Sequence, residues 1–130
     1  MKKGRIVLSL MTIFMAMFLL FCLSCTPTES LPEQGITILS PKANDVVQAG
    51  APYEIQWKAE VPDSEFGANV TIEFSKDGGK SWEKVDENVP NSGKYMWKVP
   101  KVDSTQCKIR ISSKSKPGRY RGTSEIFSVK

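Results

Sequence analysis

Short runs in which apolar and polar residues alternate dominate residues 35–130 of this chain. In residues 53–58, 70–75, 95–99 and 107–111 every second side chain is apolar. A period of two is typical of a strand that buries one face in an antiparallel sheet. Three further short runs complete the set, at 36–39, 82–85 and 127–129. About seven such strands, without a helical period, predict an all-β, antiparallel immunoglobulin/fibronectin-like β-sandwich.

A tight hairpin is predicted between the runs 70–75 and 82–85. Asp77, Gly78 and Gly79 lie there, and the two glycines can adopt positive φ angles without steric cost. Residues 75–82 resemble the Asp-box, a Ser-x-Asp-x-Gly-x-Thr/Ser-Trp hairpin of sialidase propellers, where it is a structural turn. The resemblance implies a structural role here, with Trp82 packed across the hairpin.

The N-terminus resembles a bacterial lipoprotein signal peptide. Positions 2–5 are mainly basic, residues 6–23 are almost wholly apolar, and Ser24 stands directly before Cys25. In the lipobox of such signals the cysteine is diacylated and becomes the first mature residue. The resemblance implies that residues 1–24 are a signal peptide, expected to be helical, and that Cys25 carries a diacylglyceryl group inserted among membrane lipids.

Two other interpretations of residues 6–23 stay open. The run is about long enough to span a bilayer as an uncleaved helix. Ordinary secretory cleavage is the second, although no Ala-x-Ala-like site is present. All three export the remaining chain. It is therefore expected outside the cytoplasm in the bacterial cell envelope, at the outer membrane if the cell is Gram-negative.

The positive charge of the chain comes mainly from this signal. The chain carries 18 Lys and Arg residues against 14 Asp and Glu residues. Removing Lys2, Lys3 and Arg5 with the signal leaves 15 basic residues against the same 14 acidic ones. Nucleic-acid binding needs a strong basic surplus, so no nucleic-acid partner is expected.

Residues 25–34 are predicted to be a tether, and residues 35–130 a single domain. Prolines, hydroxyl residues and glutamates give the tether too little apolar surface to offset its chain entropy. The domain holds one cysteine, Cys107, and so cannot close an internal disulfide. Alternation places Cys107 on the apolar face of its strand, which predicts a buried thiol.

The order of segments along the domain resembles a known family. The segments that carry the likeness are Ile36-x-Ile38-x-x-Pro41, Gly50 to Trp57, 75–82, 89–100, 107–112 and 124–129. Together they resemble the Ig-like domain of the Ser-Thr-rich GPI-anchored membrane protein family, over nearly all of residues 36–129. The resemblance implies a β-sandwich in a cell-envelope or extracellular setting, without agreed catalytic residues. In fungi the family is linked to cell-wall glucan assembly.

The residue types argue against catalysis. The chain has no histidine, which removes Ser-His and Cys-His nucleophile pairs and histidine metal sites. No predicted helix follows the Gly-rich turn, as a phosphate-binding loop requires. The carboxylates alternate outward on strands or lie in loops, as solvated surface charges do. We therefore predict no enzyme, no cofactor and no metal site.

Three functions remain open. The first is a non-catalytic binding or adhesion module with an envelope protein or polysaccharide as its partner. The second is a structural or assembly subunit of an envelope complex. The third is an accessory module for carbohydrate-active proteins.

Two loops are the candidate binding surfaces, because function on sandwiches usually lies in the end loops. Immunoglobulin topology puts the loops 59–69 and 112–124 at one end. The first carries Glu60, Asp63, Glu65 and an exposed-looking Phe66. The second carries the candidate contacts Lys114, Lys116, Arg119, Tyr120 and Arg121. Their opposite charges either pair with one another, or the second loop binds an anionic or carbohydrate ligand.

Overall fold

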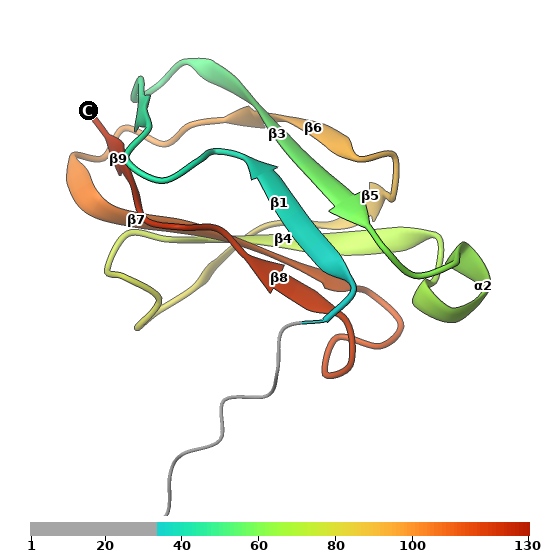
Figure 1. Ribbon diagram of the computed structural model, residues 1–130. Helices are drawn as coiled ribbons and strands as arrows, with labels where there is room; N and C mark the ends of the chain where they lie inside the picture. The colour runs from blue at the N-terminus through green and yellow to red at the C-terminus, as the bar shows by residue number, and fades with distance from the viewer. Residues whose placement is uncertain (1–33) are drawn as a thin grey trace, which may run out of the picture. The chain divides into compact units, whose positions relative to one another are not determined.

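Two packed β-sheets form the domain, which confirms the predicted all-β sandwich (Figure 1). The computed structural model describes residues 34–130. The strands are β1 (Ile36–Ser40), β2 (Val46–Val47), β3 (Pro52–Ala59), β4 (Asn69–Ser75), β5 (Glu83–Pro90), β6 (Lys94–Lys98), β7 (Ser104–Ser113), β8 (Arg121–Thr123) and β9 (Phe127–Val129). A short helix, α2 (Asp63–Phe66), lies between β3 and β4.

One sheet has the strand order β1-β3-β6, and the other has the order β2-β9-β7-β4-β5 with β8 also paired to β7. The parallel pair β2–β9 lies at the edge of the second sheet, and β9 pairs antiparallel with β7 on its other side. The predicted signal peptide, Cys25 and nearly all of the predicted tether lie outside the described residues. Within residues 34–130, no helix has the length and apolar character needed to cross a bilayer.

All seven predicted runs are strands, and two short strands were not expected. One of them, β8, lies antiparallel to β7, as β9 does, so β8 and β9 form an interrupted last strand. At the interruption the hydroxyl of Ser124 accepts a hydrogen bond from the Ile109 amide at 2.9 Å. The Ser124 amide donates to the Ile109 carbonyl at 2.8 Å. The hydroxyl thus replaces a backbone acceptor where the strand breaks.

The fifth strand is longer than the predicted run at 82–85. Its pairing with β4 shifts register on both sides of Ile72, where β5 carries extra residues. Such bulges break the period of two along a strand. The polar residues 86–88 are therefore part of the strand although they do not alternate, and Val89 beyond them is buried in the core.

The core lies between the sheets and contains both predicted tryptophans. Trp57 and Trp97 are each 3% exposed, and the ring of Trp97 packs on Phe74 with centroids 5.0 Å apart. The indole N–H of Trp57 donates to Asn91 Oδ1 at 2.9 Å, so its polar atom is satisfied. Cys107 is fully buried, as predicted, and burial raises the pKa of its thiol.

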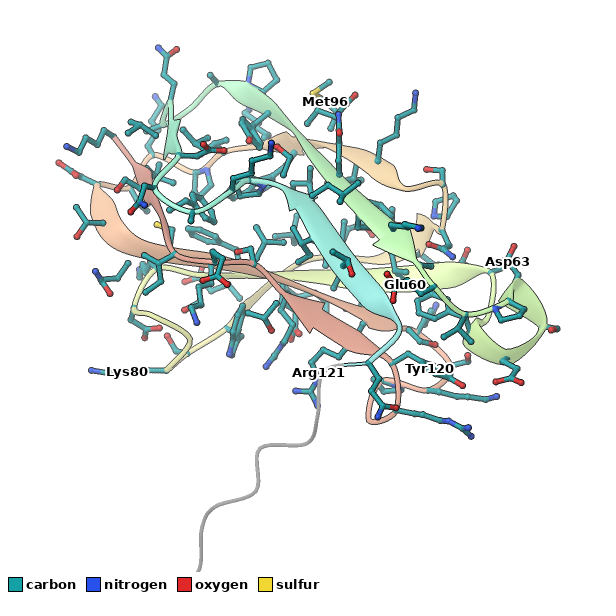
Figure 2. The ribbon with its side chains drawn as sticks, in the orientation of Figure 1. Glu60, Asp63, Lys80, Met96, Tyr120 and Arg121 are labelled. Atoms are coloured by element: carbon teal, nitrogen blue, oxygen red, sulfur yellow. The ribbon has the colours of Figure 1, made fainter. Side chains whose placement is uncertain are left out.

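A close approach of β8 to β1 completes one side of the core. A Cβ on Gly122 would lie 2.4 Å from the Ile36 carbonyl oxygen, so only glycine fits there. Next to it, the Arg121 amide donates to the Gln34 carbonyl at 3.0 Å. The first described residue therefore lies beside Arg121, where the chain enters the domain (Figure 2).

Candidate functional site

Three connections meet at one end of the sandwich: residues 60–68 with α2, residues 91–93 and residues 114–120. The Asn91 side chain donates to Asp63 Oδ1 at 3.3 Å, and the rings of Phe66 and Tyr120 lie 5.7 Å apart. Figure 2 shows Asp63 and Tyr120 at this end and Lys80 far from it. The two loops singled out in the sequence therefore share one end, as predicted.

Phe66 was expected to be exposed, and this prediction was wrong. The side chain is 0% exposed, because α2 turns the loop back and directs the ring into the core. The hydroxyls of Ser113 and Ser115 donate to the Phe66 carbonyl, which ties α2 to the end of β7. Phe66 closes the core at this end and is not a surface contact.

Tyr120 also lies in the core, which corrects its prediction as a binding contact. The residue is 4% exposed, and its ring packs against Phe66. Its hydroxyl donates to Glu65 Oε2 at 3.0 Å. Burial, together with the Glu65 carboxylate, raises the pKa of the phenol. Tyr120 joins the two loops and leaves the basic side chains as the candidate contacts.

The basic residues of the predicted binding loop are distributed around Tyr120. Lys116 is exposed in the loop, and the Arg119 guanidinium lies 5.3 Å from the centroid of the Tyr120 ring. Lys114 Nζ donates to Asn88 Oδ1 at 2.6 Å. Arg121 lies on β8 and is half-buried, so the loop that connects β7 to β8 is 114–120 and not 112–124.

The opposite charges of the two loops do not pair. Across residues 34–130, no ion pair joins a basic side chain of 114–121 to a carboxylate of 60–68. The link between the loops is instead the hydrogen bond from the Tyr120 hydroxyl to Glu65. The structure therefore does not support the alternative in which the charges of the two loops only neutralise one another.

A groove of about 360 Å³ opens beside Arg121 on the outer face of β4, β7 and β8. It is lined by Thr71, Glu73, Arg110, Ser112, Lys114, Pro117, Gly118 and Arg121. Arg110 Nε donates to Glu73 Oε2 at 2.7 Å, and its guanidinium lies 4.1 Å from the centroid of the Trp82 ring. Sequence reasoning did not connect Arg110 with this site. Alternation along the strand predicts that the Arg110 side chain points outward, but only the register of β4 on β7 places it opposite Glu73.

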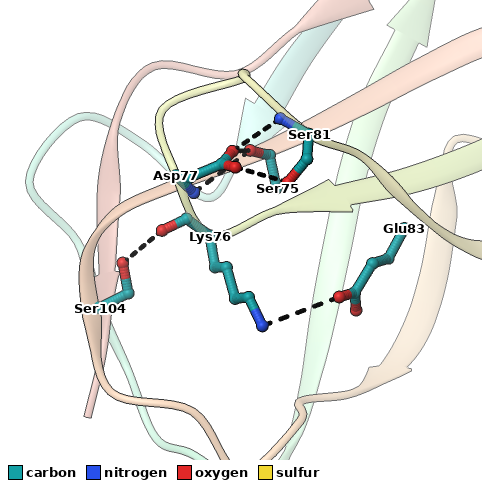
Figure 3. A network of polar contacts seen from close by, with 6 residues as sticks. All are labelled: Ser75, Lys76, Asp77, Ser81, Glu83 and Ser104. Atoms are coloured by element: carbon teal, nitrogen blue, oxygen red, sulfur yellow. Dashed lines mark hydrogen bonds and ion pairs between the residues drawn. The ribbon is translucent and has the colours of Figure 1, made fainter.

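The predicted hairpin at Asp77 is present and forms a closed polar network (Figure 3). Gly78 and Gly79 have φ angles of 76° and 93°. Asp77 Oδ1 accepts hydrogen bonds from the Ser75 hydroxyl at 2.7 Å and from the Ser81 amide at 2.9 Å. These bonds, with the Ser81 hydroxyl as the largest cause, hold the pKa of Asp77 well below its usual range. The polar atoms serve the turn itself, which supports the structural role.

Acid should weaken this hairpin. A lowered pKa means that the folded state binds a proton at Asp77 less readily than the unfolded chain does. The stability that it contributes is therefore present above the unfolded pKa of about 4 and is lost as the pH falls below it. Melting temperatures measured between pH 5 and pH 2 should fall less steeply for Asp77→Asn than for wild type. Asp103→Asn is the control; equal slopes for all three proteins would contradict the prediction.

The remaining candidates for chemistry are sparse. Within the part of the chain that the structure describes, no three Cys, Asp or Glu residues are grouped closely enough to hold a metal ion. The thiol of Cys107 is enclosed by the core. The basic end and its groove are thus the parts of the surface with the most distinctive chemistry.

Comparison with family models identifies the domain as Ig-like. Residues 40–129 match the model of the family described as the Kre9/KNH-like N-terminal Ig-like domain. Among solved structures, the chain is similar to the fibronectin(III)-like modules of Clostridium thermocellum CbhA, at 19% sequence identity and a TM-score of 0.41. That match covers 73% of this chain and 45% of the solved chain, so this chain spans less than half of its length. No curated protein matches the sequence.

Proposed function

Because this chain belongs to the family of Kre9/KNH-like N-terminal Ig-like domains, we propose that it is a non-catalytic binding module of the bacterial cell envelope. A diacylglyceryl group on Cys25 holds it to the membrane, and residues 26–34 are the spacer. Its partner is an anionic molecule of the envelope, a polysaccharide or the acidic surface of a protein. The proposal builds on the Ig-like fold of the domain.

One observation carries the proposal: cationic side chains gather at the loop end, and no carboxylate of residues 34–130 lies within ion-pair distance of them. Lys116 and Arg119 project from the loop 114–120, and Arg121 lies at its base. Since no ion pair among residues 34–130 joins them to the acidic loop, their charge is available to a ligand. Arg is enriched where proteins bind one another, and its planar fork suits carboxylates and phosphates.

The anchor is tested on the chain made in bacterial cells. Mature protein should begin at a lipidated Cys25, and Cys25→Ala should abolish labelling by a radioactive or clickable fatty acid. Mass analysis of the purified N-terminus is the measurement. Recovery of an unmodified full-length chain as the main species would support the uncleaved membrane helix instead.

Binding is tested by reversing charge in the loop. Lys116→Glu with Arg119→Glu should lower capture of the protein's partner from intact cells about tenfold, since each exposed ion pair is worth up to about 1 kcal/mol. Capture by wild type should also weaken as salt rises, because the Debye length is about 8 Å at physiological ionic strength. Both side chains lie on the surface side of the loop, so the melting temperature should hardly change.

The matched control reverses two lysines at the opposite end, Lys80→Glu with Lys101→Glu. Both lysines are exposed, and they lie away from the loop 114–120. Their substitution changes the net charge of the protein by the same amount as the loop variant does. If the control and the loop variant capture the partner as wild type does, the binding proposal fails. The structural-subunit alternative predicts that outcome, with the envelope phenotype depending only on the presence of the folded domain.

A further inference from the structure

We propose that the groove beside Arg121 is a binding site for a phosphate group, and that this phosphate belongs to an anionic lipid headgroup. The lipid source rests on the anchor proposed above, whereas the phosphate site rests on the described residues alone. Docking there would bring the basic end of the domain down onto the bilayer that holds the chain.

The charge of the groove favours an anion. Arg110, Lys114 and Arg121 line it, and Glu73 is the carboxylate among its lining residues. Arg121 is half-buried, and no carboxylate within residues 34–130 lies within ion-pair distance of it. Charges taken out of water are normally paired, so a half-buried arginine without a partner is a place for an external anion.

Arg110 is held ready for such a ligand. Its Nε bonds Glu73 at 2.7 Å, and Trp82 supports the guanidinium plane at 4.1 Å. This contact with Glu73 uses Nε, so it leaves the two terminal nitrogens of the guanidinium available to a ligand. A guanidinium that is already fixed loses little freedom when it binds, and two parallel N–H groups fit two phosphate oxygens.

The arrangement suits phosphate better than a carboxylate. Cations converge from β7, from β8 and from the loop between them, and hydroxyl residues Thr71 and Ser112 line the floor. The phosphodiester of a lipid headgroup holds two charged oxygens and two ester oxygens tetrahedrally, so it can accept from several of these directions, whereas a carboxylate presents two oxygens in one plane.

The position of the groove favours a lipid as the source of the phosphate. The Arg121 amide bonds the Gln34 carbonyl at 3.0 Å, so the groove lies where the chain enters the domain (Figure 2). Residues 26–34 can span at most about 30 Å from Cys25. A tether of that length keeps the groove at a high effective concentration of headgroups. Each basic residue near an anionic bilayer strengthens attachment about fivefold.

The experiment uses the full lipidated protein in phosphatidylcholine vesicles, made with or without phosphatidylglycerol. The acyl anchor is the same in both, so its contribution cancels. Hydrogen exchange of the amides in 114–121 is the measurement. Phosphatidylglycerol should slow this exchange about tenfold, and salt at about 1 M, where the Debye length is about 3 Å, should reverse the effect.

Two variants remove the site in different ways. Arg121→Gln removes the unpaired charge, and Gly118→Trp fills the groove. No atom lies within 4 Å of a Cβ placed on Gly118, so the larger side chain causes no clash at the backbone. Both variants should lose the protection while keeping the wild-type melting temperature. The control variant Lys80→Gln, at the opposite end, should keep the protection against exchange.

Free inorganic phosphate and a polyuronate are the further probes, added to phosphatidylcholine vesicles. Protection by phosphate that Arg121→Gln abolishes supports the phosphate site. If phosphatidylglycerol then has no effect, the lipid source is overturned. Protection by the polyuronate, with phosphate and phosphatidylglycerol inert, overturns the phosphate site in favour of an acidic glycan. The phosphate site would also be overturned if Arg121→Gln kept the protection that phosphatidylglycerol gives to wild type.

The two proposals can fail separately. Loss of partner capture in the Lys116 and Arg119 double variant, with no response to any phosphate, would leave the binding module standing without this site. A chain that lacks a lipid on Cys25 would remove the proposed anchor, while the phosphate titration would still report on the groove.

Discussion

Replacing Trp97 by alanine should lower the free energy of unfolding by about 3–5 kcal/mol, as aromatic-to-alanine changes in a core do. Trp97 is 3% exposed and packs on Phe74 across the two sheets, so its loss leaves a cavity that both sheets border. Domains of this size are stable by about 5–15 kcal/mol. Urea unfolding followed by circular dichroism should therefore show a much lower midpoint and little folded protein at physiological temperature.

Met96 is the matched control for this substitution. Met96 directly precedes Trp97 on β6, but its side chain points outward and is 60% exposed. Met96→Ala should change the midpoint hardly at all. Trp57→Ala, on the neighbouring strand, should behave like Trp97→Ala, because Trp57 is buried and bonded to Asn91. A melting temperature unchanged by either tryptophan substitution would show that the assignment of strand faces is wrong.

Replacing Tyr120 by alanine should cost a similar amount, about 3–5 kcal/mol. The ring fills the end of the core against Phe66, and the hydroxyl holds Glu65 of α2. Its loss should loosen both the loop 114–120 and the loop 60–68. Thermal unfolding measures the cost, and hydrogen exchange should show faster opening at this end than at the Asp77 hairpin.

Tyr120→Phe separates the two contributions of the side chain. It keeps the packing and removes one hydrogen bond, worth about 1 kcal/mol. If Tyr120→Ala lowered partner capture without lowering stability, the ring would be a surface contact after all, contrary to its burial. For the same reason, alanine replacement of Arg119, Tyr120 and Arg121 together cannot test binding, since it would damage the fold.

The strands were predictable because their signal is local. Alternation in residues 53–58 and 107–111 reports which side chains face the core, and the structure confirms the faces of Trp57 and Cys107. The hairpin at Asp77 was predictable for the same reason, since its glycines and hydroxyls act within one turn. The interrupted strand β8 was missed, because Arg121-Gly122-Thr123 has no apolar alternation.

The candidate site was predictable only in part. The basic residues and the shared end of the two loops followed from the chain order and the sandwich topology. The burial of Phe66 and Tyr120 did not, because each ring packs in the core against residues far away in the chain. An aromatic residue in a polar loop looks exposed until its distant partner is known.

The sequence by itself determined the fold class, the buried faces of the strands, the hairpin and the absence of histidine chemistry. These depend on residue type and on neighbours along the chain. Only the tertiary structure decided the groove. It arises because the register of β4 on β7 sets Glu73 opposite Arg110, and the register of β8 on β7 sets Arg121 opposite Ser112. Those contacts join segments far apart in the chain, and no local pattern encodes the distance between them.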